Sequence, residues 1–258
     1  MKQSKIIPLL MLFFICCSSA EKNVTQSAAQ GDARALLEKI TLINNSAPVS
    51  YDMTFTAEAL MNNQKYKLNG NAQFDKTAAR LSLFFTDFIF KSPISMMFND
   101  GESVVMYFPS EKKLYRYNKN TIDFRSLWNV NLDYPVVHDI MTGRIPVIDG
   151  YTVKEAVLSA DSKTSYLILE NSRYYETISF KNDIPDKIKI MDKSNRSETD
   201  FYFSGAKKYG ESFMFKKISI VSKAAWRFDV AIDSLKVNVP MKVKTINDIQ
   251  IPLDVIGR

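Results

Sequence analysis

The chain has 258 residues, of which 46% are hydrophobic and only eight are glycine. This composition can bury a sizeable core and excludes a disordered or low-complexity chain. The formal charge of +6 is modest and is scattered along the chain, which excludes a basic patch of the kind that binds nucleic acid. Ordinary solubility explains this charge, with a mild attraction to anionic surfaces such as lipid headgroups as the alternative.

The first twenty residues have the pattern of a secretory signal peptide. Two lysines precede an apolar run from Ile6 to Ile15, which is too short to span a bilayer, and small residues follow. Cleavage after Ala20 fits the small-residue rule. Lipidation at Cys17 is the alternative that we prefer, because the preceding residues resemble a relaxed bacterial lipobox. Both cysteines of the chain, Cys16 and Cys17, lie here, so the rest of the chain has none to form a disulfide.

A tether and a helix are expected next. Residues 21–31 are small and polar, which predicts a flexible tether between a membrane anchor and a folded domain. From Asp32 onward, apolar residues recur at helical spacing, and the helix is expected to stop at residues 44–48, which end in Pro48. We take residues 32–258 as one domain.

Two strands with one wet face follow the helix. Apolar and polar residues alternate over residues 51–59 and again over residues 65–74, with a turn at residues 62–63. This alternation is typical of an antiparallel meander. Gly70 lies inside the second strand and predicts a bend or a bulge.

The stretch from Arg80 to Tyr117 reads as three or four further strands. Its strongest local signal is Asn99-Asp100-Gly101, because glycine tolerates the positive φ of a tight hairpin turn. Near residues 84–90 both faces of the strand are apolar, which a sheet with one wet face does not need. A lid, a partner or a ligand is therefore expected to cover the second face.

The second half of the chain begins with a break in the alternation. Residues 121–143 lose it, and apolar residues around Tyr134 and Pro135 fit short helical turns. From Thr152 strands dominate again, near 152–158, 164–170, 173–181, 186–192, 198–204, 213–221 and 225–239. The phase slips at Asp233-Ser234, which predicts a bulge. The fold class is mainly β, with about eleven strands, an N-terminal helix and a short central helical lid.

Residues suited to catalysis are scarce. His138 is the only histidine, so no histidine-based triad or paired-histidine metal site can be built, and a core or surface role is expected for it. There is no phosphate-binding loop and no dinucleotide fingerprint. Carboxylates are scattered and none is paired with another by the pattern. No catalytic residue, metal or cofactor is predicted.

Methionine and aromatic residues are plentiful along the expected sheet. Methionine is flexible and suits surfaces that adapt to variable apolar partners, although it also fills irregular cores. A long curved sheet with few helices to cover its inner face favours an apolar cavity. Its candidate lining residues are Met53, Phe55, Leu68, Phe74, Leu83, Phe85, Met97, Met106, Phe108, Trp226 and Phe228.

Three segments resemble the LolA/LolB superfamily of bacterial lipoprotein carriers and receptors. Leu36 to Ile40 resembles the opening helix of the family, and Asp100 to Tyr117 resembles its hairpin with a "DG…W-Y-P" pattern. Val105 and Met106 stand where the family usually has tryptophan. Residues 251–255 after the last strand resemble the terminal strand of the family, which contains proline.

The resemblance implies an incomplete, strongly curved antiparallel barrel with a helical lid, whose hollow binds the acyl chains of lipoproteins. It also implies transfer across the periplasm or reception at the outer membrane. The receptor branch is itself a lipoprotein with an exposed apolar loop that aids membrane insertion. Phe88, Ile89 and Phe90 are the candidates for a comparable loop, with a buried strand end as the alternative.

The sequence therefore predicts a monomeric, non-enzymatic protein of the bacterial cell envelope that transfers lipids or lipoproteins toward the outer membrane. Its partners would be acyl chains and, through an N-terminal lipid, the membrane. The main alternative is a structural or interaction lipoprotein whose barrel is filled by its own side chains. A lipid-modifying or glycan-cleaving enzyme would need two convergent carboxylates, which no motif indicates.

Overall fold

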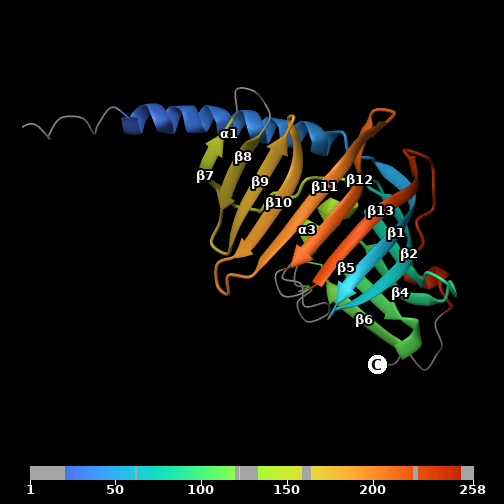
Figure 1. Cartoon of the computed structure of the whole chain (residues 1–258). Coiled ribbons are helices and arrows are strands. Elements are labelled where there is room, and N and C mark those ends of the chain that lie inside the picture. The colour runs from blue at the N-terminus through green and yellow to red at the C-terminus, as the bar shows by residue number, and fades with distance from the viewer. Residues whose placement is uncertain are drawn as a thin grey trace, which may run out of the picture.

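A computed structural model describes residues 21–61, 63–119, 122, 133–158, 164–222 and 226–250. The expected signal peptide, Cys17, the cleavage site after Ala20 and residues 251–255 lie outside the described residues. One antiparallel sheet of thirteen strands dominates the fold, and Figure 1 shows it curving strongly. In pairing order the strands are β6 (Lys113–Asn118), β5 (Ser103–Phe108), β4 (Pro93–Asp100), β3 (Arg80–Asp87), β2 (Gln64–Asp75), β1 (Ser50–Met61), β13 (Trp226–Val237), β12 (Ser212–Ser222), β11 (Glu198–Tyr209), β10 (Ile184–Asp192), β9 (Tyr174–Lys181), β8 (Ser165–Glu170) and β7 (Thr152–Val157).

The mainly β, unclosed architecture is confirmed, and the predicted strand number was slightly low. The stretch from Arg80 to Tyr117 contributes four strands, because the turns at residues 88–92 and 109–112 each end one strand and start another. Gly101, at φ +92°, lies in the hairpin turn between β4 and β5 as expected. The short helix α3 (Tyr134–Met141) lies where helical turns were predicted.

The N-terminal helix α1 (Glu21–Asn45) begins earlier than expected. This segment, residues 21–31, was expected to form a flexible tether and belongs to the helix. Its sequence contains good helix formers and no proline, so a helix that starts at Asp32 can extend backward. In Figure 1, α1 passes over the ends of β7, β8 and β9, and its first turns project beyond β7. Leu36 and Ile40 point into the core.

Two local irregularities were predicted, and one of them is present. Between β1 and β13 the register shifts at Asp233, which confirms the predicted bulge. The pairing of β2 is regular on both sides of Gly70, so no bulge lies there. Gly70 serves close packing instead, because a Cβ at this position would lie 2.0 Å from the ring of Phe55.

The second apolar face near Phe84 is covered by the chain's own C-terminal segment. We call residues 240–250 the strap. Ile246 and Ile249 of the strap pack on the convex face of β3, β4 and β5, against a cluster that includes Phe84 and Phe98. The short 3₁₀ helix η2 (Ile246–Asp248) holds the strap's shape through a reciprocal capping box between Thr245 and Asp248. The red strap runs beside β4 in Figure 1.

Candidate functional site

The predicted lining residues share the concave face of the sheet. All eleven belong to one hydrophobic cluster or pack directly against it. Six are buried: Met53, Phe55, Phe74, Leu83, Met97 and Met106. The other five are partly exposed: Leu68, Phe85, Phe108, Trp226 and Phe228. The structure therefore brings these side chains together, and their different exposure divides the concave face into two parts.

The division is clearest along β1, whose alternate residues face the concave side. Their exposure rises from 0% at Tyr51 through 8% at Ala59 to 43% at Met61. Met61 lies at the β1–β2 hairpin, where Leu68 and Phe228 on the neighbouring strands are also partly exposed. We call this region the open end, and it is made of Met61, Tyr66, Leu68, Phe85, Ile220, Trp226 and Phe228. The region around Tyr51 is the covered half.

Three aromatic rings from separate strands mark the boundary between these parts. Phe85 on β3 packs edge-on against Phe55 on β1, with ring centroids 5.7 Å apart, and against Phe228 on β13, at 6.2 Å. Phe55 is buried, whereas the other two are partly exposed. Edge-to-face contacts between aromatic rings are a favourable packing arrangement, so the three rings form a packed apolar base. The open end is thus a partly exposed apolar surface with a packed base.

Helix α3 and the loop after it fill the covered half. The hydroxyl of Tyr51 donates to the carbonyl of Met141 at 2.7 Å. The side-chain amide of Asn44, at the end of α1, both donates to and accepts from the backbone of Ile145. Burial, followed by the neighbouring Tyr134, raises the pKa of Tyr51 far above its ordinary value. This part of the interior is occupied by the chain's own side chains.

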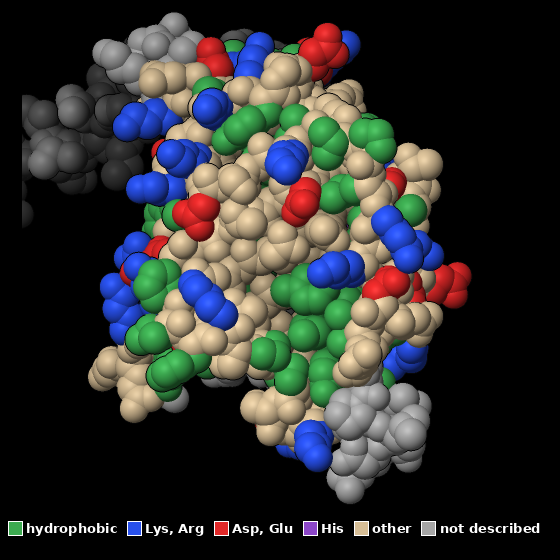
Figure 2. Space-filling model, turned by 90° about the vertical axis from the view of Figure 1, so that its right-hand side faces the viewer, with side chains coloured by type: hydrophobic (Ala, Val, Ile, Leu, Met, Phe, Trp, Pro, Cys, Tyr) green, Lys and Arg blue, Asp and Glu red, His purple; other side chains and the backbone are tan. Residues whose placement is uncertain are grey.

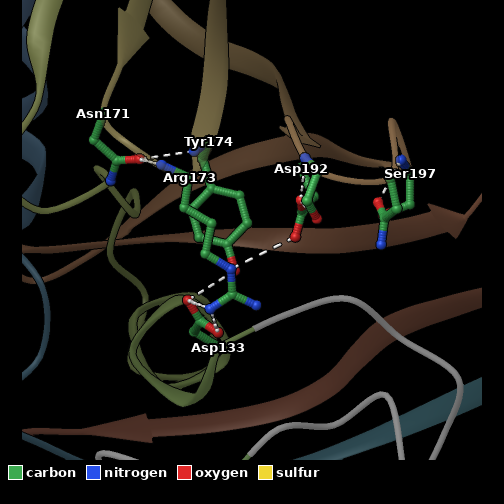
Figure 3. A network of polar contacts seen from close by, with 8 residues as sticks. Asp133, Asn171, Arg173, Tyr174, Asp192 and Ser197 are labelled. Atoms are coloured by element: carbon green, nitrogen blue, oxygen red, sulfur yellow. Dashed lines mark hydrogen bonds and ion pairs between the residues drawn. The ribbon is translucent and has the colours of Figure 1, made fainter.

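A polar network holds the start of α3, as Figure 3 shows. Arg173, at the start of β9, donates to Asp133 at 3.1 Å, and the hydroxyl of Tyr174 donates to the same carboxylate at 2.9 Å. The Nε of Arg173 lies 3.5 Å from the buried carboxylate of Asp192. Asn171 orients the pair by accepting both backbone N–H groups of Arg173 and Tyr174. We call the Asp133–Arg173–Tyr174–Asp192 group the latch, because it fastens α3 to the sheet.

Glu176 on β9 is a carboxyl group buried under the loop that follows α3. Its Oε2 accepts the backbone N–H of Ile148 at 3.0 Å, while its Oε1 is buried without a hydrogen-bond partner. Burial raises the pKa of Glu176 to about 8, against the lowering effect of the Ile148 hydrogen bond. Glu176 is therefore protonated at neutral pH. No role was predicted for Glu176, because its neighbours along β9 alternate normally.

The predicted membrane loop is well formed and exposed. Ile89 and Phe90 are 76% and 82% exposed, so the alternative of a buried strand end does not describe them. The Asp87 carboxylate accepts the backbone N–H groups of both residues, at 2.8 and 2.7 Å. Asn69 donates to the carbonyls of Asp87 and Phe88. The loop backbone is thus fixed while the side chains at its tip point into water.

The loop and the open end lie at the same end of the sheet. Leu68 at the open end pairs with Asp87, the residue at which the loop begins. Figure 2 shows the side of the molecule that lies at the right of Figure 1, where hydrophobic side chains gather in patches with lysine and arginine side chains around them. An apolar ligand at the open end would therefore lie close to the exposed loop.

Other kinds of site find no support in the described ranges. In residues 21–250, apart from the gaps given above, no group of potential ligands could hold a metal ion. Over the same ranges, no helix has the length and apolar character needed to cross a bilayer. His138 is partly buried on α3, with its ring centroid 6.0 Å from that of Phe74.

Comparison with known structures identifies the fold. A LolA superfamily protein from Nitrosomonas europaea matches 81% of this chain and 95% of its own, with a TM-score of 0.54 and 12% identity. A domain assigned as an outer membrane lipoprotein-sorting protein from Vibrio parahaemolyticus matches 85% of this chain and 96% of its own (TM-score 0.58, 10% identity). The fold is LolA/LolB-like.

A third solved structure, a DUF1329 family protein from Desulfovibrio piger, matches with a TM-score of 0.58 and 11% identity over 82% of this chain and 95% of its own. No family model and no curated protein sequence matches the chain. At such low identities the LolA/LolB-like likeness concerns the fold alone.

Proposed function

We propose that this protein binds acyl chains of lipids or lipoproteins at the open end and transfers them within the bacterial cell envelope, without catalysis. The observation that carries the proposal is the rise in exposure along the concave face of β1, from 0% at Tyr51 to 43% at Met61. Large contiguous apolar surfaces are rarely left exposed to water, and where they occur they usually bind another molecule.

The energetics of acyl-chain binding fit such a surface. Each buried CH₂ group stabilises the bound state by about 0.8 kcal/mol, so a few methylene groups on the open end suffice for reversible binding. Leu68, Phe85 and Phe228 provide apolar contacts from β2, β3 and β13. Longer chains would have to displace α3, which the latch opposes.

The cellular setting follows from the same proposal. The signal-like segment and Cys17 would anchor the protein in a membrane facing the periplasm, and the outer membrane is our preferred location. Two of the structures with this fold are a LolA superfamily protein and a lipoprotein-sorting domain, which agrees with a role in lipoprotein traffic. Ile89 and Phe90 would touch the bilayer during transfer.

A second candidate function is a structural or interaction lipoprotein that carries no lipid. It is favoured by the covered half, where Tyr51, Met53 and Phe55 are almost fully buried by the chain itself. In this case the open end would receive a protein partner. Native mass spectrometry of the protein extracted from its own membranes separates the two candidates, because only the carrier would retain acyl ligands.

A fluorescence experiment tests binding at the open end directly. The chain has two tryptophans, so Trp128→Phe leaves Trp226 as the single reporter. Brominated fatty acids should quench Trp226, and unbrominated fatty acids should restore its emission. The variant Leu68→Ser should weaken this binding, while Leu42→Ser on the exposed surface of α1 should not. Absence of quenching by any chain length would overturn the carrier proposal.

A further inference from the structure

Two lysines converge on one aromatic ring of the loop after β3. The Nζ of Lys67 on β2 lies 4.1 Å from the centroid of the Phe88 ring, and the Nζ of Lys91 lies 5.1 Å from it. Ammonium groups are attracted to the face of an aromatic ring, and the attraction grows when water is removed. The two lysines are therefore held beside the exposed tip formed by Ile89 and Phe90.

The charge around this tip is positive. Asp87, the carboxylate next to the tip, is occupied by the backbone N–H groups of Ile89 and Phe90. A third lysine, Lys65, lies on the same strand as Lys67 and pairs with Glu58 at 2.7 Å. Lys67 and Lys91 make no ion pair within the described residues, so their charge is available to another molecule.

We propose that residues 67 and 88–91 form a docking site for an anionic lipid surface. Ile89 and Phe90 enter the acyl region, the Phe88 ring stays at headgroup level, and the ammonium groups of Lys67 and Lys91 bind lipid phosphates. Since an ammonium above a ring keeps N–H donors free, it contacts the ring and a phosphate at the same time. This inference rests on the proposed function and adds the class of membrane with which the protein exchanges cargo.

Vesicle binding divides into a contribution from the lysine charges and a contribution from the apolar tip. Each lysine near an anionic bilayer contributes about 1 kcal/mol of attraction, which falls with added salt, whereas burial of Ile89 and Phe90 does not depend on lipid charge. The tip alone would therefore bind neutral and anionic vesicles equally. Selection of anionic vesicles requires Lys67 and Lys91.

Vesicle sedimentation tests this division. The probes are vesicles of phosphatidylcholine alone and of phosphatidylcholine with 30% phosphatidylglycerol, where the 30% is chosen at roughly the anionic fraction that gives a strong surface potential. The wild type should prefer the anionic vesicles on the order of tenfold or more at low salt, and the preference should shrink in 0.5 M salt, roughly as Debye screening requires. Lys67→Gln with Lys91→Gln should abolish the preference and keep the weak binding to neutral vesicles. Ile89→Ser with Phe90→Ser should weaken binding to both.

Two matched variants make the result specific. Lys207→Gln with Lys208→Gln removes the same charge from the exposed end of β11, near the β11–β12 hairpin, and should leave the preference unchanged. Lys67→Arg with Lys91→Arg should restore it, because arginine keeps both the charge and the contact with the ring. The proposal is overturned if the Gln pair at 67 and 91 binds like the wild type, or if the pair at 207 and 208 loses as much.

Fatty-acid quenching of Trp226, measured on the same variants, separates this inference from the proposed function. Loss of the vesicle preference with intact quenching supports an independent docking site. Loss of quenching in the Gln pair would show that the lysines act on the acyl-binding surface instead, and would overturn the proposal. Soluble glycerol phosphate should not compete at concentrations near those of the vesicle lipid, because it lacks the apolar part.

Discussion

The covered half and the open end are built from the same strands with the same kinds of residue, yet they differ in what covers them. Tyr51 and Met61 lie on the same face of β1, but α3 lies over Tyr51 and not over Met61. The strands therefore determine which side chains face inward. The elements that cover the sheet determine whether those side chains are buried or exposed. Stability and binding should accordingly depend on different residues of one face.

The largest expected effect tests this separation directly. Phe55→Ala in the covered half should lower the free energy of unfolding by about 3–5 kcal/mol, because it leaves a cavity under packed neighbours. Phe228→Ala at the open end should cost roughly half of that or less, because the partly exposed ring loses fewer contacts. Denaturant unfolding measures both, and equal losses would mean that the open end is core as well.

The next effect concerns the contact that lies between the two parts. Gly70→Ala places a Cβ against the Phe55 ring and should destabilise the protein by about 1–3 kcal/mol. In a Phe55→Leu background the same change should cost less, because the smaller side chain leaves room. A double-mutant cycle with no coupling between these positions would contradict the close approach.

The pH dependence of stability should report on Glu176. Its pKa of about 8 in the folded protein is above its ordinary value of 4.5, so the folded chain keeps a proton that the unfolded chain loses. Stability should therefore fall as the pH rises from 4.5 to 8. Glu176→Gln should remove this slope in chemical unfolding measured across the range.

Glu170 is the matched control, because it lies on the same sheet with the opposite behaviour. Hydrogen bonds from Lys193 and Lys154 lower the pKa of Glu170, which is partly exposed. It contributes stability above its ordinary pKa and loses it as the pH falls. Glu170→Gln should leave the slope between pH 5 and 8 in place, and a loss of that slope would remove Glu176 as its source.

The smallest effect tests whether the covered half can open. Asp133→Asn weakens the latch and should cost about 1 kcal/mol of stability, as expected for a partly exposed ion pair with hydrogen bonds. Amide exchange should rise in α3 and not in β1. Arg34→Gln, which breaks an exposed pair with Glu38 on α1, should change neither. Faster uptake of long acyl chains by Asp133→Asn would show that α3 acts as a lid.

Much of the sheet could be predicted because its signals are local. The alternation of β1, the turn at Gly101 and the phase slip at Asp233 each depend on a few neighbouring residues, and each was predicted where the structure has it. The role of Gly70 could not be predicted, since it depends on a ring from the adjacent strand. The extension of α1 over residues 21–31 was missed because polarity was taken as a sign of flexibility.

The face of the sheet on which the candidate residues lie could be predicted, whereas their exposure could not. The parity of the strands was enough to place Met53, Leu68 and Phe228 on one face. It could not show which of them are covered, because the cover comes from α3, the latch and residues far away in the chain. The strap over Phe84 was missed for the same reason: residues 240–250 have no periodic pattern, and their contacts are long-range.

The pairing of β1 with β13 has a consequence for how this protein forms. Thr54 and Ser234, whose hydroxyls meet across that ladder, are 180 residues apart in the sequence. The strands before α3 and those after it can each form through neighbouring hairpins. They become one sheet only when β13 pairs with β1. Joining such distant segments is slow. A chain exported through a membrane would therefore complete its fold only after nearly all of it had crossed, and until then the edges of β1 and β13 would be the surfaces most in need of a chaperone.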